Sequence, residues 1–377
     1  MRGRNRVSST RGPGERPLSN DSNAAPKLER SKIRRAALIF VVGSIVIMSV
    51  TLALTTDDET WRGVVSFGGW LVALLFVVSF LRMCLEALSV LILINGTRAG
   101  KINLLEALEL TIESYFVTQL IPVTAAGVPY QAFLLTRKGV RAGWATAVVL
   151  VKGFVPGLFF FFVLVATVAV TALGLEVSDR IARFLRIVGP LAALPLAFIV
   201  TMVVIVIRYP SLFDRLVDRL GAFLKRKLPG KAAEKVEEAL VLMEDESHIF
   251  RDALTTLGRQ RRWVLVLGTL LIILAFLTEF MVAVVILWGF GYRGSMVGPL
   301  VLQCILKPVL AATPTPGSLA FGEGGYIAFF AAFLPASFVG VSLVLWRLVL
   351  YFVPMFVGGS LVAKRIGRGF VTGKAED

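Results

Sequence analysis

Seven ionisable side chains lie inside stretches that are otherwise apolar, and these residues are the best candidates for chemistry. Each such group costs roughly 2.5–3.5 kcal/mol at the centre of a bilayer, so it is rarely kept without a use. Four are cations and three are anions, so pairing among them leaves positive charge over. Surplus positive charge, together with backbone N–H groups at helix ends, suits an anion such as a phosphate. The seven residues are Arg82, Glu86, Lys152, Glu279, Lys307, Glu323 and Arg347.

A structural role is the competing interpretation for part of this set. Arg82 and Glu86 are four residues apart and can pair on one helix face, while Lys307 can extend toward the membrane surface. Lys152 and Arg347 are stronger functional candidates, because each follows a Pro/Gly-rich break at the same distance. Glutamates 106, 109 and 113 form an acidic face that either rests in the cytoplasmic interface or binds an amine or a proton.

Composition defines the elements that must position these side chains. The chain has 377 residues, of which 56% are hydrophobic and 17% charged, with a net charge of +15. Its apolar runs reach the roughly 20 residues that a spanning helix needs. This excludes a soluble enzyme, a disordered regulator and a disulfide scaffold, and predicts an all-α polytopic membrane protein. Two cysteines in apolar runs and a single histidine give no metal cluster or Cys/His pair, so no cofactor is expected. No soluble domain displays a basic patch for nucleic acid.

Six full spans are predicted from the apolar runs, and basic loops orient them. Lys and Arg favour the cytoplasmic side, which places both termini there. Residues 1–35 are expected to be a disordered basic tail, followed by a transmembrane domain over 36–365, with an amphipathic insert at 208–262 and a tail at 366–377. The predicted spans are 36–54, 64–94, 144–173, 188–207, 264–288 and 337–362.

Two further stretches, 104–130 and 297–333, are predicted to be re-entrant helical hairpins with Pro/Gly tips, and the first begins with a helical pattern over 104–120. Broken backbone at membrane depth is tolerated only inside protein or beside a wet cavity. The first break covers 121–130, with Pro122 and Tyr130, and is followed by Gln131; the second covers 313–318, with Pro316 and Gly317, and a glycine-rich run over 321–326. We expect all five residues near a binding site.

A shift of 195 residues relates two halves of the chain. It places 127–135 on 322–330 and Lys152 on Arg347. Repeat one covers about 64–173 and repeat two about 259–363. Since the first starts outside and the second inside, the repeats are of inverted topology, an arrangement in which many transporters place a central site between broken helices.

The run at 314–323, with 345–351 and Pro354, resembles the carboxy-terminal signature of the lysylphosphatidylglycerol synthase transmembrane-region family, also called flippase-like domain proteins. The likeness covers about 36–365 and implies a lipid-translocating domain of the bacterial or archaeal cell membrane. The family usually has arginine where this chain has Lys152. Full-length family enzymes add a soluble aminoacyltransferase domain, which is not expected here because the chain ends at Asp377.

These observations predict a transporter, not an enzyme, that moves an anionic phosphate-bearing lipid between leaflets. The phosphate is expected among Lys152, Arg347 and Arg82, between the tips near Pro122 and Pro316, with Glu279 and Glu323 balancing the cations or taking up a proton. The alternatives are a membrane-embedded glycosyl- or aminoacyl-transferase and a non-catalytic scaffold. A homodimer is left open.

Overall fold

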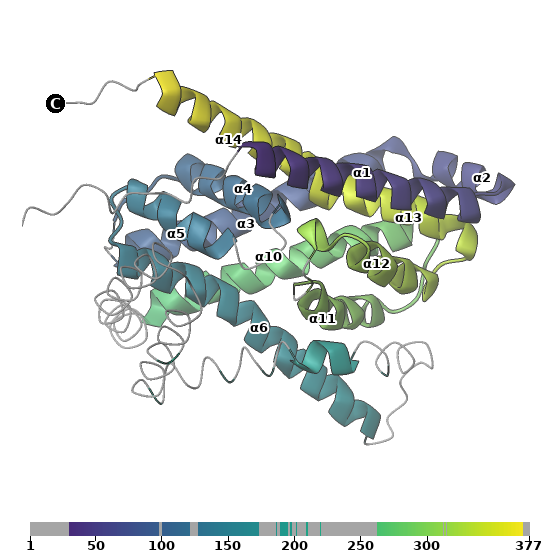
Figure 1. Cartoon of the computed structure of the whole chain (residues 1–377). Helices are drawn as coiled ribbons and strands as arrows, with labels where there is room; N and C mark the ends of the chain where they lie inside the picture. Colours follow the sequence, from purple (N-terminus) through teal and green to yellow (C-terminus); the bar gives the residue numbers. More distant parts are fainter. Residues whose placement is uncertain are drawn as a thin grey trace, which may run out of the picture.

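The computed structural model describes residues 30–97, 100–120, 127–172, 262–311, 313 and 315–371, together with 186, 189–194, 197, 201, 209 and 219. Within these residues every regular element is a helix, as the apolar composition predicts (Figure 1). The insert at 208–262, most of the span at 188–207 and the tip residue Pro122 lie outside this part of the chain, as do the two predicted tails except for the first residues of the first helix and the end of the last.

The first six helices comprise three long elements separated by shorter ones. The short α2 begins at an N-cap, where the Asp57 carboxylate accepts a hydrogen bond of 2.8 Å from the Thr60 amide. The elements are α1 (Arg30–Thr55), α2 (Asp58–Phe67), α3 (Gly69–Thr97), α4 (Leu104–Leu120), α5 (Gly127–Arg137) and α6 (Ala142–Ala172).

The second half repeats the order from α3 to α6. Shifted by 195 residues, α4 falls on 299–315 and α5 on 322–332, beside the observed 297–311 and 321–331. The shift was predicted from residue patterns alone, and the helix order agrees with it. The elements are α10 (Arg262–Gly289), α11 (Val297–Ala311), the 3₁₀ turn η3 (Pro316–Ser318), α12 (Phe321–Ala331), α13 (Ala336–Arg347), the π-helix η4 (Leu348–Phe352) and α14 (Val353–Val371).

Four helical stretches in the described part are long and apolar enough to cross a membrane. They match four of the six predicted spans within a few residues, and α1 contributes a shorter apolar stretch over Val41–Thr55. The inverted orientation and the re-entry of the hairpins stay predictions. The four stretches are Gly69–Thr97, Ala142–Val170, Arg262–Gly289 and Ala336–Arg365.

Two sequence-based boundaries were wrong. The start of the predicted 64–94 span lies in a separate helix, α2, because Gly68 (φ 72°) turns the chain before α3 begins. The breaks in both hairpins are also shorter than predicted, since Tyr130 and the glycine-rich run 322–326 are helical. In the second hairpin the turn is confined to a few residues, where Gly317, Ser318 and Ala320 all have positive φ.

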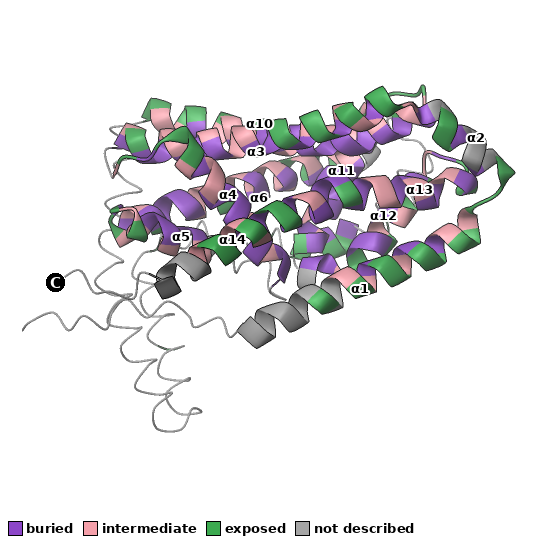
Figure 2. Ribbon diagram, turned by 90° about the horizontal axis from the view of Figure 1, so that it is seen from above, coloured by how far each residue is buried: buried purple, intermediate pink, exposed green. Residues whose placement is uncertain are grey.

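The two halves interlock. Helix α3 packs along α10, and small residues bring them together: a Cβ on Gly268 would lie 2.7 Å from Leu93, and one on Gly96 would lie 2.7 Å from Val264. Helix α6 packs on α11 of the other half, and α14 packs on α4. The short pairs α4–α5 and α11–α12 lie toward opposite ends of the long helices (Figures 1 and 2).

The distribution of polarity is that of a membrane protein. The outer faces of the long helices are exposed and carry large apolar side chains, such as Val77 and Phe80 on α3 and Leu270 on α10 (Figure 2). Charged residues such as Arg82 and Arg347 are buried instead. A protein surrounded by hydrocarbon, and not by water, is expected to place apolar side chains outside and charged ones inside.

Candidate functional site

Five charged side chains from four helices form a continuous line of alternating sign, here called the charge chain: Lys152, Glu86, Arg82, Glu279 and Lys307. Lys152 Nζ lies 2.7 Å from Glu86 Oε1, and Glu86 Oε2 lies 3.2 Å from Arg82 Nη2. Arg82 Nε lies 3.0 Å from Glu279 Oε2, and Glu279 also pairs with Lys307. The chain therefore joins α6, α3, α10 and α11, which come from both halves.

The charge chain carries one excess positive charge, because three cations share two carboxylates. Its middle is the most buried part: the side chains of Arg82 and Glu279 are 7% and 6% exposed. Both ends are lysines and are more open, at 15% for Lys152 and 23% for Lys307. The excess charge is therefore reachable at the ends, where a mobile anion could meet it.

Gln131 adds an open donor beside Lys152. Its Oε1 accepts a 2.9 Å hydrogen bond from Lys152 Nζ, and since an ammonium can only donate, the amide oxygen must face the lysine. Its Nε2 then points elsewhere; it is buried and has no hydrogen-bond partner in the described part of the chain. A buried unpaired N–H₂ group costs about 1–3 kcal/mol, so an acceptor at this position would be stabilising.

Arg347 is held apart from the charge chain, in a contact that closes the second hairpin turn. It lies 2.7 Å from Glu323, with both side chains fully buried, and its Nη1 donates to the Gly317 carbonyl at 3.2 Å. Glu323 also accepts hydrogen bonds from Ser44 Oγ (3.1 Å) and the Ala320 amide (2.7 Å). The charges of Arg347 and Glu323 balance, so this cluster, unlike the charge chain, has no surplus to offer an anion.

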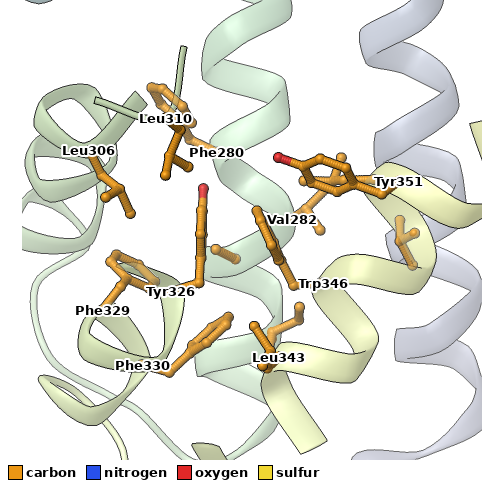
Figure 3. Packing of buried hydrophobic residues seen from close by; sticks show 14 of the residues in the cluster. Phe280, Val282, Leu306, Leu310, Tyr326, Phe329, Phe330, Leu343, Trp346 and Tyr351 are labelled. Carbon is orange, nitrogen blue, oxygen red and sulfur yellow. The ribbon is translucent and has the colours of Figure 1, made fainter. Parts of the chain in front are cut away.

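Aromatic side chains contact Arg347 and pack the second hairpin against the last membrane-spanning stretch. The guanidinium lies 4.1 Å from the centroid of the Tyr351 ring and 5.1 Å from that of Trp346. Trp346 stacks on Tyr326 of α12, with ring centroids 3.6 Å apart (Figure 3). These rings fix the end of α13 and the start of η4, so the turn that holds Pro316 is rigidly attached to the core.

The acidic face of α4 is also paired. Glu113 is buried and lies 2.8 Å from Arg365 of α14, and it accepts a hydrogen bond of 3.2 Å from the Tyr130 hydroxyl. The Tyr130 hydroxyl therefore binds the carboxylate that joins α4 to α14, and not the Lys152 site. Glu106 lies 2.5 Å from Lys138, whose hydrogen bond lowers the pKa of this carboxyl at the end of the short hairpin. Glu113 and Glu106 accordingly act as ties between helices.

The predicted site residues therefore fall into separate groups. Lys152, Gln131, Glu86, Arg82, Glu279 and Lys307 are brought together; Arg347, Glu323 and Gly317 form the hairpin contact; Tyr130 lies with Glu113. Sequence reasoning missed Tyr115, whose ring centroid lies 4.7 Å from Arg82 Cζ. The signal was present, since Tyr115 is two residues after Glu113 on a helix already singled out, but aromatic residues were not considered as partners of the buried cations.

Comparison with known proteins agrees with the family suggested by the sequence motifs. The description "lysylphosphatidylglycerol synthase TM region" matches residues 36–358. The chain is similar to a UPF0104 membrane protein of Archaeoglobus fulgidus, with 26% identity over 331 residues, which is 86% of this chain and 95% of that protein. No solved structure matches the chain. On the strength of the match over 36–358, together with the buried cations and apolar outer faces, this chain is a membrane protein of the lysylphosphatidylglycerol synthase transmembrane-region family.

Proposed function

We propose that this protein carries a lipid with an anionic phosphate headgroup across the cell membrane of a bacterium or archaeon, with the phosphate held at the Lys152 end of the charge chain. The excess positive charge of that chain is the observation that carries the proposal. A headgroup that crosses hydrocarbon unassisted loses its hydration and meets a large ionic cost. A buried site with one surplus positive charge offsets that cost for one negative charge.

The contacts of the phosphate are assigned to Lys152, Gln131 and Arg82. Lys152 supplies an ammonium that is still partly exposed, and the buried Nε2 of Gln131 supplies a donor without a partner. Arg82, which lies beyond Glu86 in the charge chain, carries the positive charge that Glu86 and Glu279 share. Arg347 takes a different role from the one its sequence position suggested: it stabilises the second hairpin turn through Glu323.

The interlocked halves offer a way to expose this site to each leaflet in turn. The short helix pairs lie toward opposite ends of the long helices (Figures 1 and 2), as inverted repeats with hairpins from opposite faces require. The charge chain crosses from one half to the other, because Arg82 and Glu279 lie on α3 and α10. A rocking motion between the halves therefore acts directly on the residues that hold the headgroup.

Reconstitution into liposomes tests this function. Purified protein in vesicles that contain fluorescent phosphatidylglycerol should accelerate its exchange between leaflets, measured by chemical quenching of the outer leaflet. Lys152→Ala removes a charge-assisted contact of about 1.5–3 kcal/mol, so exchange should fall roughly 10- to 100-fold. Lys138→Ala is the matched control, because Lys138 pairs with Glu106 outside the charge chain.

Two outcomes would contradict the proposal. Exchange no faster than in protein-free vesicles would rule out transport of this lipid class. Chemical conversion of the lipid, detected by mass spectrometry of the same vesicles, would instead favour the transferase alternative.

A further inference from the structure

We propose that Tyr115 is a positioning residue that couples Arg82 to a kink in the last membrane-spanning stretch, so that headgroup binding changes the angle of α14. The inference rests on the proposed function and assigns the regulation of that same site. Tyr115 is the residue whose ring contacts the central cation of the charge chain and whose hydroxyl contacts the backbone of the kink.

What we call the kink is the π-helix η4, the irregular segment that begins directly after Arg347 and joins α13 to α14. In it the Val353 amide donates to the Leu348 carbonyl, one residue further back than in an α-helix. Pro354 has no N–H, so the Leu350 carbonyl, four residues before it, lacks its normal helical donor. A π-helix next to a proline is a recognised cause of bending, and such elements are frequent at functional sites.

Two side-chain hydroxyls stabilise the carbonyls of the kink. Tyr115 of α4 donates to the Leu350 carbonyl at 2.6 Å, and Ser79 of α3 donates to the Val349 carbonyl at 3.2 Å. Leu350 and Val349 are both buried, so no water is at hand to replace these donors. The geometry of η4 therefore depends on where the helices α3 and α4 hold their hydroxyl groups.

Tyr115 differs from Ser79 because it also touches the charge chain. Arg82 Cζ lies 4.7 Å from the centroid of the Tyr115 ring, within the range of a cation–π contact. A phenol ring is rigid, so a shift of the ring also shifts its hydroxyl. Phosphate binding draws Arg82 away from one of its carboxylates, moves the ring and weakens the bond to Leu350.

Helix α14, which follows η4, is in close contact with α4, the helix that carries Tyr115. It packs on α4 through Gly358, where a Cβ would lie 2.7 Å from Phe116 Cβ and 2.8 Å from the Ile112 carbonyl. It is also tied to α4 by the pair Arg365–Glu113. A small change of angle at η4 therefore moves α14 relative to α4.

The experiment compares Tyr115→Phe with Ser79→Ala, its matched control. Both remove one hydroxyl from the kink, but only Tyr115→Phe separates the kink from Arg82, because the ring keeps its contact with the guanidinium while the bond to the Leu350 carbonyl is lost. Spin labels at Val357→Cys on α14 and Leu270→Cys on α10, both exposed positions, report the distance between these helices, with Cys84 and Cys304 replaced by alanine. Dihexanoyl phosphatidylglycerol is the probe, and its affinity is measured by calorimetry.

We expect the probe to shift the label distance in the otherwise unsubstituted protein and in Ser79→Ala, and to leave it unchanged in Tyr115→Phe. Affinity should stay within about twofold in Tyr115→Phe, while lipid exchange falls at least about tenfold. A second variant, Pro354→Ala, restores a backbone donor to Leu350; it should also abolish the shift, although Pro354 contacts no headgroup ligand.

A shift that persists in Tyr115→Phe, or that is lost equally in Ser79→Ala, would overturn the coupling and leave the proposed function intact. A protein that binds the probe without any shift would also overturn it. Failure of the unsubstituted protein to bind the probe at all would instead remove the proposed function, and the coupling with it.

Discussion

Replacement of Glu86 by glutamine should tighten binding of the phosphate, because it raises the excess charge of the charge chain from one to two. The magnitude follows from the geometry. Glu86 lies 2.7 Å from Lys152, and a phosphate on the far side of the ammonium adds a hydrogen bond of about 2.8 Å. The carboxylate then lies roughly 5.5 Å from the bound oxygen. At an effective dielectric constant near 20, this repulsion is about 3 kcal/mol.

Removal of that repulsion corresponds to roughly 100-fold in affinity as an upper limit, since about 1.4 kcal/mol is tenfold. Rearrangement of Lys152 and Arg82 around the neutral amide reduces the gain, so we expect a 10- to 100-fold lower Kd for dihexanoyl phosphatidylglycerol. Tighter binding should slow release, and lipid exchange should fall. Calorimetry measures the first quantity and vesicle quenching the second.

The matched control is Glu106→Gln, which changes the net charge of the protein equally but lies with Lys138 away from the charge chain. It should leave the Kd unchanged. Binding to Glu86→Gln that is unchanged or weaker than to the parent protein would refute the charge argument, because the surplus would then not be what attracts the anion.

Three further predictions concern the supports of the site. Glu323→Gln leaves the buried Arg347 without its carboxylate, so the free energy of unfolding in detergent should fall by about 3–5 kcal/mol. The hydrogen bond from Lys138 lowers the pKa of Glu106, so its contribution, under about 1 kcal/mol at this exposed site, is present above the unfolded pKa near 4.3. It is lost as pH falls through the lower folded value, and thermal melts of the parent and Glu106→Gln should converge there. Gly268→Ala should cost about 1–3 kcal/mol in thermal unfolding, because the added methyl meets Leu93 of α3.

Each of these predictions has a control in the chain. Gly324→Ala, on α12, meets no atom within 4 Å and should be neutral or slightly stabilising; an equal loss in both glycine variants would contradict the packing argument. For Glu323, the double change Glu323→Gln with Arg347→Met should recover stability, since no unpaired charge remains. For Glu106, a difference from the parent that grows on acidification would have the wrong sign.

Local pattern predicted much of the fold. The apolar period with its polar face defined α4 with the boundaries that the structure shows, and the shift of 195 residues anticipated the order of the helices in the second half. The Arg82–Glu86 pair, one helix turn apart, was also expected and is present at 3.2 Å. In each case the prediction used residues within one helix or a similarity between the two halves of the chain.

Contacts between segments far apart in the sequence could not be predicted from local patterns. Nothing in the sequence assigned Lys152 to Glu86 or Lys307 to Glu279, because these pairs depend on how α6 and α11 pack against α3 and α10. The separation of α2 from α3 was missed for a local reason: Gly68 lies in an apolar run where the hydropathy signal hides a turn that only its positive φ reveals.

Lys152 and Arg347 have different environments, and this difference supports a binding role for Lys152 and a structural role for Arg347. The two residues correspond under the 195-residue shift, yet one lies at the open end of a chain with surplus charge and the other in a sealed, balanced pair. A purely structural pair of repeats would give both cations the same treatment. Arginine suits the sealed position, since its planar group can serve Glu323 and the Gly317 carbonyl together. A flexible lysine suits the open one, because its ammonium has three donors and can bind a passing anion while it keeps its contacts with Glu86 and Gln131.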